Sequence, residues 1–108
     1  MAKFLFIYRD SAVSRAQPSP EEMRALTAAW QAWMQKFSSA ILPGGDGLKR
    51  TGRIVKAGLV TDGPYLEAKE IIASYAIIQA ADYDAAVAIA RACPGDPTIE
   101  IRELAGYA

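Results

Sequence analysis

A short polar segment, residues 62–70, carries most of the candidate chemistry of this sequence. Asp62-Gly63-Pro64 favours a backbone bend, because the Asp side chain can bond the following amides and Pro fixes its own φ. A carboxylate at Asp62 or Glu70 could accept a proton from a bound molecule, and Lys69 could hold its negative charge. The segment predicts a small-molecule site, in which a lyase or isomerase step would suit these groups best.

Four further residues complete the predicted site. Tyr8 and Tyr65 would supply aromatic walls and hydroxyl donors, and Arg102 is a second cation for an acidic ligand. Trp30 lies in a helical apolar stripe, so core packing is its default role and stacking on a ligand is the alternative. The expected ligand is a small aromatic or cyclic acid, and whether it is turned over is left open.

The same segment has a structural explanation. Asp62-Gly63-Pro64 is a common turn sequence, and Glu67, Lys69 and Glu70 could form salt bridges that stabilise the fold or a dimer. Exposed pairs of this kind contribute less than about 1 kcal/mol each. A ligand site predicts that Tyr65, Lys69 or Glu70 face a cavity, whereas a structural turn predicts that they contact each other.

Composition narrows the classes of function. One domain spanning residues 1–108 is expected, and a chain with 52% apolar and 22% charged residues is globular. Basic and acidic residues both total 12, so the net charge is zero and neither nucleic acid nor a membrane is an expected partner. Histidine is absent, which removes the usual neutral-pH base, and we expect no metal and no cofactor. A single cysteine, Cys93, and an N-terminus without a signal segment indicate a cytoplasmic protein.

Capping signals and apolar spacing predict two helices. Ser19-Pro20-Glu21-Glu22 combines an N-cap, a first-turn proline and a glutamate three residues after the cap. The helix that follows carries an apolar stripe from Met23 to Phe37 and ends before Pro43. Asp82 caps the second helix, which Pro94-Gly95 closes and in which Cys93 is expected to be an inert packing residue.

Strands are predicted from β-prone runs. These cover residues 4–8, one or two short strands within 53–61 around a bulge or turn at Gly58, residues 71–79, and residues 98–102. The order β-α-β-β-α-β predicts an α+β, ferredoxin-like fold, with a four-stranded antiparallel sheet and two helices on one face. Residues 44–47 are expected to be a connector rather than a phosphate loop, and the basic residues of 49–56 a solvated hairpin edge.

The second face of this sheet needs a cover. The first and third strands are apolar on both faces, yet two helices cover only one. An open face would leave an apolar patch larger than soluble monomers usually expose. We therefore expect a homodimer in which sheet packs on sheet.

The sequence resembles the DGPF-type members of the YCII-related family. The resemblance rests on Asp62-Gly63-Pro64-Tyr65 followed by Glu67, Lys69 and Glu70, where the fourth residue is usually Phe. The strand ending in Tyr8, the helix start at 19–22, the Gly-rich residues 44–47 and the run Ile99-Glu100-Ile101-Arg102 agree with it in order. It implies a ferredoxin-like domain that pairs into a dimeric α/β barrel.

For function the resemblance implies less. Some relatives carry a His and Asp pair proposed as catalytic, and related barrels include lactone isomerases and small dehalogenating or oxygenating enzymes. The chain has no histidine, and the corresponding helix position lies near Trp30, so a His-dependent mechanism does not carry over. DGPF-type domains are also associated with sigma factors of the extracytoplasmic-function type, so a non-catalytic regulatory accessory is the alternative function.

Overall fold

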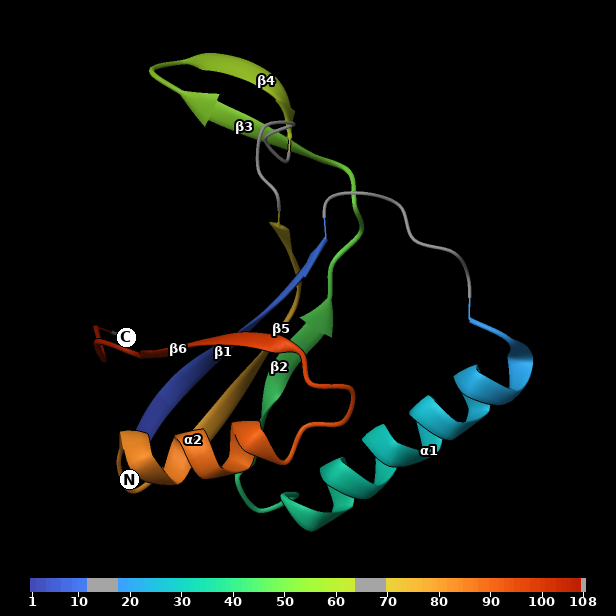
Figure 1. Ribbon diagram of the computed structural model, residues 1–108. Coiled ribbons are helices and arrows are strands. Elements are labelled where there is room, and N and C mark those ends of the chain that lie inside the picture. Colours follow the sequence, from blue (N-terminus) through green and yellow to red (C-terminus); the bar gives the residue numbers. More distant parts are fainter. Residues whose placement is uncertain (12–17, 64–69, 108) are drawn as a thin grey trace.

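The computed structural model describes residues 1–11, 18–63 and 70–107 (Figure 1). The predictions for Pro64, Tyr65, Glu67 and Lys69 therefore fall outside the described residues. The described segments form strands and helices in this order: β1 Ala2–Ser11, α1 Pro20–Lys36, β2 Ile41–Gly47, β3 Gly52–Lys56, β4 Leu59–Gly63, β5 Glu70–Ala80, α2 Tyr83–Arg91 and β6 Thr98–Glu103.

The main sheet has the strand order β2-β5-β1-β6, and every neighbouring pair is antiparallel. The two long strands β1 and β5 occupy its centre, as expected for the two runs that are apolar on both faces. Both helices lie on one face (Figure 1). The predicted ferredoxin-like α+β fold is confirmed.

The second strand of that sheet is not the predicted one. Residues 44–47, predicted as a connector, belong to β2, and residues 53–61 form a separate hairpin of β3 and β4 that projects from one end of the sheet (Figure 1). One glycine of β2 allows a close approach of the two backbones: a Cβ on Gly45 would lie 2.7 Å from the carbonyl oxygen of Tyr75. Glycine in a strand often marks such an approach, which a turn-based interpretation misses.

The hairpin itself has the predicted turn. Ala57 and Gly58 both have positive φ, +51° and +81°, as a two-residue turn that matches the twist of its strands requires. The sequence predicts a backbone bend at Asp62 and Gly63, but both residues lie within β4, where Asp62 pairs with Arg53. Strand pairing with β3 thus replaces the expected bend at these two residues.

The core lies between the sheet and the helices. Phe4, Phe6 and Tyr8 alternate along β1 and point to one face, where Ile78 of β5 joins them. Trp33 of α1 and Ala86 and Ile89 of α2 complete the cluster, and the Trp33 indole donates a hydrogen bond to the Ile89 carbonyl at 3.1 Å. That hydrogen bond ties the two helices together.

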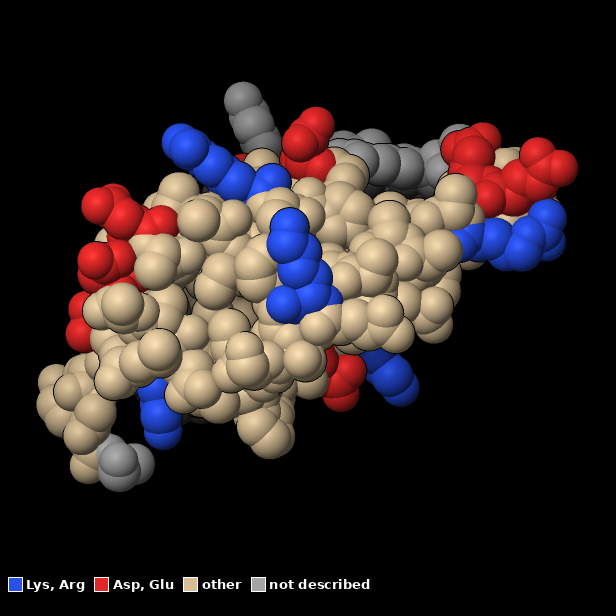
Figure 2. Space-filling view, turned by 90° about the horizontal axis from the view of Figure 1, so that it is seen from below, with Lys and Arg blue, Asp and Glu red and all other residues tan. Residues whose placement is uncertain are grey.

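Helix α1 begins as predicted but covers less of the core than its stripe suggests. The Ser19 hydroxyl accepts a hydrogen bond from the Glu22 amide, and Pro20 is in the first turn. Only Trp33 is buried, whereas Met23, Leu26 and Met34 are 45%, 40% and 54% exposed. In the view from below, most charged side chains lie toward the edges of a largely uncharged surface (Figure 2). Among the residues that the structure describes, no helix has the length and apolarity needed to cross a membrane.

Candidate functional site

Tyr8 and Trp30 meet on the helix face of the sheet. Their rings are T-shaped, with centroids 5.9 Å apart, and Trp30 makes a second T-shaped contact with Trp33 at 5.6 Å. Trp33 is the core residue of the two tryptophans, while Trp30 is only half-buried. Trp30 thus packs on the core, as its default role predicts, while the residue stays partly accessible, and stacking on a ligand remains a prediction.

Two cavities share this aromatic pair in their walls. The first, the apolar cavity, measures about 360 Å³ and is lined by Tyr8, Trp30, Trp33 and Met34, among others. The second, the mixed cavity, measures about 310 Å³ and also has Tyr8 and Trp30 in its wall. Small-molecule pockets commonly start at about 300 Å³. A ring bound against Tyr8 and Trp30 could therefore extend into either cavity.

Ionisable groups enter the mixed cavity from several parts of the chain. Arg9 and Asp10 come from the end of β1, Glu70 from the start of β5, and Asp96 from the loop after α2. The mixed cavity therefore contains three of the predicted site residues, Tyr8, Trp30 and Glu70, which are far apart in sequence.

A β-bulge explains how two neighbouring residues of β5 share this wall. Tyr8 pairs with Ser74 but Arg9 pairs with Ile72, so the register shifts and Ala73 is the extra residue on β5. In a regular strand Ala73 and Ser74 would point to opposite faces, whereas a bulge re-aims side chains locally. Both line the mixed cavity, together with Tyr8 and Arg9.

Tyr8 is a neutral group in this site. Its hydroxyl lies 3.7 Å from the Cys93 sulfur, and burial, aided by that hydrogen bond, raises the pKa of Tyr8 well above its usual value. Burial also raises the pKa of the Cys93 thiol, although the hydrogen bond with Tyr8 opposes part of this rise. Tyr8 can therefore form a wall or take part in hydrogen bonds near neutral pH, but it cannot serve as a base.

The predicted cation Arg102 lies elsewhere. It pairs with Leu5, on the sheet face opposite the helices, and its guanidinium contacts Glu100 at 3.3 Å. Glu100 also binds Arg9, and the hydrogen bonds from Arg9 and then Arg102 lower the pKa of the Glu100 carboxyl. Arg9 is the basic residue described in the wall of the mixed cavity, and with five N–H donors it retains capacity beyond its bond to Glu100.

Asp62 is also apart from the two cavities. It lies on the β3–β4 hairpin, its side chain is 94% exposed, and it contacts Arg53 at 3.5 Å. Neither cavity has Asp62 in its lining. The structure thus brings Tyr8, Trp30 and Glu70 together and leaves Asp62 and Arg102 on other surfaces, while Tyr65 and Lys69 fall outside the described residues.

Two residues of the site were missed by sequence reasoning. Arg9 follows Tyr8 directly, and strict alternation assigns it to the other face. Ser74 sits inside an apolar run that reads as buried strand, yet it lines both cavities. The polar residue in that run was a usable signal for Ser74, whereas Arg9 is found only from the cavity lining of the folded chain. Within the described residues, no group of three or more acidic or Cys side chains is placed to hold a metal ion.

The sequence matches the family model of the YCII-related domain over residues 2–103. The chain belongs to the YCII-related family. The match covers every helix and strand of this YCII-related domain, from β1 to β6. A search of curated proteins found no match to it.

Proposed function

We propose that this YCII-related protein binds a small aromatic or cyclic acid against Tyr8 and Trp30. The observation that carries the proposal is the aromatic pair itself, which walls two adjoining cavities of about 360 and 310 Å³. One cavity is built mainly from aromatic and aliphatic side chains and the other carries ionisable groups. This combination of an apolar wall with a few polar groups is typical of small-molecule sites.

Arg9 would hold the acid group of the ligand. A guanidinium can bind a carboxylate through two parallel hydrogen bonds, and Arg9 lines the mixed cavity next to Tyr8. In this proposal Arg9 takes the role that the sequence assigned to Lys69 or Arg102. Arg102 keeps its contact with Glu100 on the opposite sheet face.

Glu70 would supply the acid–base step if the ligand is turned over. It lines the mixed cavity, where its carboxylate could take a proton from a ligand atom and return it at a neighbouring atom, which is an isomerase-type step. Tyr8 stays protonated and would donate a hydrogen bond to developing negative charge. Catalysis is thus an extension of the binding proposal, and the two can be tested separately.

A ligand screen tests the binding proposal. Thermal-shift measurements with small aromatic and lactone acids should yield a stabilising ligand, since a ligand at a hundred times its Kd adds about 2.7 kcal/mol to stability. Trp30→Leu and Arg9→Gln should each remove the shift, whereas the matched variant Arg102→Gln should keep it. Hits that persist in both Trp30→Leu and Arg9→Gln would place the ligand elsewhere.

The dimer is part of the same proposal. The sheet face opposite the helices carries Leu5, Ile7, Tyr75 and Ile77, which are only partly buried in the single chain. A second copy stacked on this face would cover them and produce the barrel that the family resemblance implies. The regulatory alternative is association with a sigma factor, and it stays a prediction. Capture of a sigma factor, together with no hit in the ligand screen, would favour it.

A further inference from the structure

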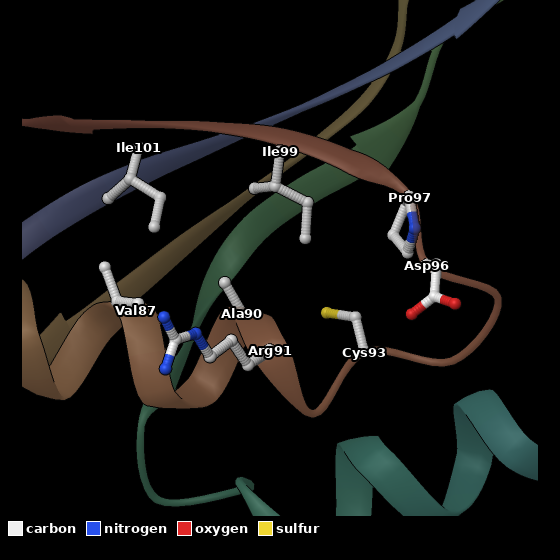
Figure 3. A pocket seen from close by; sticks show the side chains of 8 residues that line it. All are labelled: Val87, Ala90, Arg91, Cys93, Asp96, Pro97, Ile99 and Ile101. Carbon is white, nitrogen blue, oxygen red and sulfur yellow. The ribbon is translucent and has the colours of Figure 1, made fainter.

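A third cavity lies between α2 and β6, on the edge of the sheet opposite β2. It measures about 390 Å³ (Figure 3). Ile99 and Ile101 point into it from β6, Val87 and Ala90 face them from α2, and Cys93 closes its inner side (Figure 3). The floor of this α2–β6 cavity is therefore aliphatic.

Two opposite charges stand at the rim of this aliphatic floor. Arg91 comes from the last turn of α2 and Asp96 from the loop before β6. In Figure 3 the Arg91 guanidinium extends toward Val87, while the Asp96 carboxylate lies at the Pro97 end, so the two groups do not point at each other. Among the described residues, neither side chain has a hydrogen bond or ion pair. Both charges are thus available to a ligand.

The backbone conformation at Asp96 supports a ligand-binding role for this residue. Asp96 has a φ of +46°, in the left-handed region that non-glycine residues seldom adopt, although Asp and Asn tolerate it best. Such conformations persist where the surrounding structure holds them, and they cluster at ligand sites. Gly95, which also has a positive φ, and Pro97 flank the residue, and Asp96 and Pro97 both line the cavity.

We propose that the α2–β6 cavity binds a small aliphatic zwitterion, with its carboxylate on Arg91, its ammonium group on Asp96 and its apolar middle on Ile99 and Ala90. The separation of the two rim charges favours a molecule whose own charges are separated by methylene groups, such as an ω-amino acid. This site is distinct in ligand class from the aromatic site at Tyr8 and Trp30. It shares with that site only Asp96 and Pro97, which line the mixed cavity as well.

Three probes of one chain length isolate each charge. In an NMR titration of the ¹⁵N-labelled full chain, 6-aminohexanoate carries both charges, hexanoate only the carboxylate and hexylamine only the ammonium group. Because each rim contact is an exposed ion pair, we expect the zwitterion to bind about two- to fivefold tighter than either single-charge probe. The shifted amides should lie between Ala90 and Ile101.

Matched variants assign the two contacts. Arg91→Gln keeps the helix propensity and should lower the affinity for the zwitterion to that for hexylamine. Asp96→Asn tolerates the positive φ and should lower the affinity for the zwitterion to that for hexanoate. Arg24→Gln, on the exposed side of α1, and Trp30→Leu, in the aromatic site, should leave the Kd unchanged.

Several results would overturn the proposal. If hexanoate or hexylamine bound as tightly as the zwitterion, the second charge contact would be refuted. An unchanged Kd for the zwitterion in both Arg91→Gln and Asp96→Asn would refute the site itself. Shifts centred on the Trp30 indole, lost in Trp30→Leu, would assign the zwitterion to the aromatic site instead. Absence of any shift up to the solubility limit of 6-aminohexanoate would also contradict it.

Discussion

Glu100 is held by two guanidinium groups on the sheet face opposite the helices. Arg9 and then Arg102 lower the pKa of its carboxyl below the unfolded value of about 4.3. A depressed folded-state pKa adds stability that is present above the unfolded pKa and is lost as the pH falls through the folded pKa. The same Arg9 reaches the mixed cavity, so this ion pair also positions a proposed ligand contact.

Glu100→Gln should therefore weaken the dependence of the free energy of unfolding on pH in the acid range. Urea unfolding curves near neutral pH and below about pH 4 would show a smaller loss of stability for Glu100→Gln than for the unmodified chain. Glu103→Gln, on the same strand, serves as the matched control. An identical loss in all three proteins would show that the Arg9–Glu100–Arg102 cluster contributes nothing to stability.

Cys93 should react slowly with thiol reagents in the folded protein. The residue is 6% exposed, and burial raises the pKa of its thiol, so the reactive thiolate is scarce near neutral pH. The rate of modification by a chromogenic disulfide should rise strongly when the chain is unfolded in urea. Equal rates in the folded and unfolded chain would contradict the buried environment. The sequence predicted an inert Cys93, but its hydrogen bond to Tyr8 joins residues 85 positions apart and required the fold.

At the scale of elements, β2 shows where local interpretation failed. Its Gly-rich residues are typical of a connector, yet the strand pairs with β5 through Ile41 and Leu42 and then through Asp46 and Gly47, with an irregularity between them. The hairpin residues 53–61, which have the better strand propensity, remain outside the main sheet. Membership in a sheet depends on which partner the chain can reach, and propensity reports only part of that.

Gly45→Ala should destabilise the protein by about 1–3 kcal/mol through overpacking. A Cβ at this position would lie 2.7 Å from the Tyr75 carbonyl oxygen and 2.9 Å from the Ala76 Cα, both of them backbone atoms that cannot swing aside. The matched variant Gly47→Ala meets nothing within 4 Å and should change stability by less than about 0.5 kcal/mol. Similar unfolding midpoints for the two variants would argue against the close approach of β2 and β5.

At the scale of the whole molecule, the single chain is less compact than its length suggests. Its radius of gyration is 15.7 Å, whereas a compact chain of this length has about 13 Å. The projecting hairpin exposes Val55, Leu59 and Val60. An extended outline with apolar side chains at its surface is consistent with a protomer that pairs with a second copy.

Light scattering coupled to size-exclusion chromatography should therefore report a dimer. Ile77→Lys places a charge on the sheet face opposite the helices and should shift the protein toward monomer while circular dichroism stays unchanged. Met23→Lys, on the exposed stripe of α1, is the control and should remain dimeric. A monomer at micromolar concentration in the unmodified protein would refute sheet-on-sheet pairing.

The sequence alone determined the features that depend on neighbours in the chain. The caps at Ser19 and Asp82, the tight turn at Gly58 and the alternation of Phe4, Phe6 and Tyr8 follow from local hydrogen bonding and side-chain geometry, and all are present. Only the tertiary structure decided which strand completes the sheet and which side chains share a cavity. Tyr8, Arg9, Trp30 and Glu70 meet because strand pairing and packing bring distant segments together, and one chain segment read alone carries no signal for such contacts.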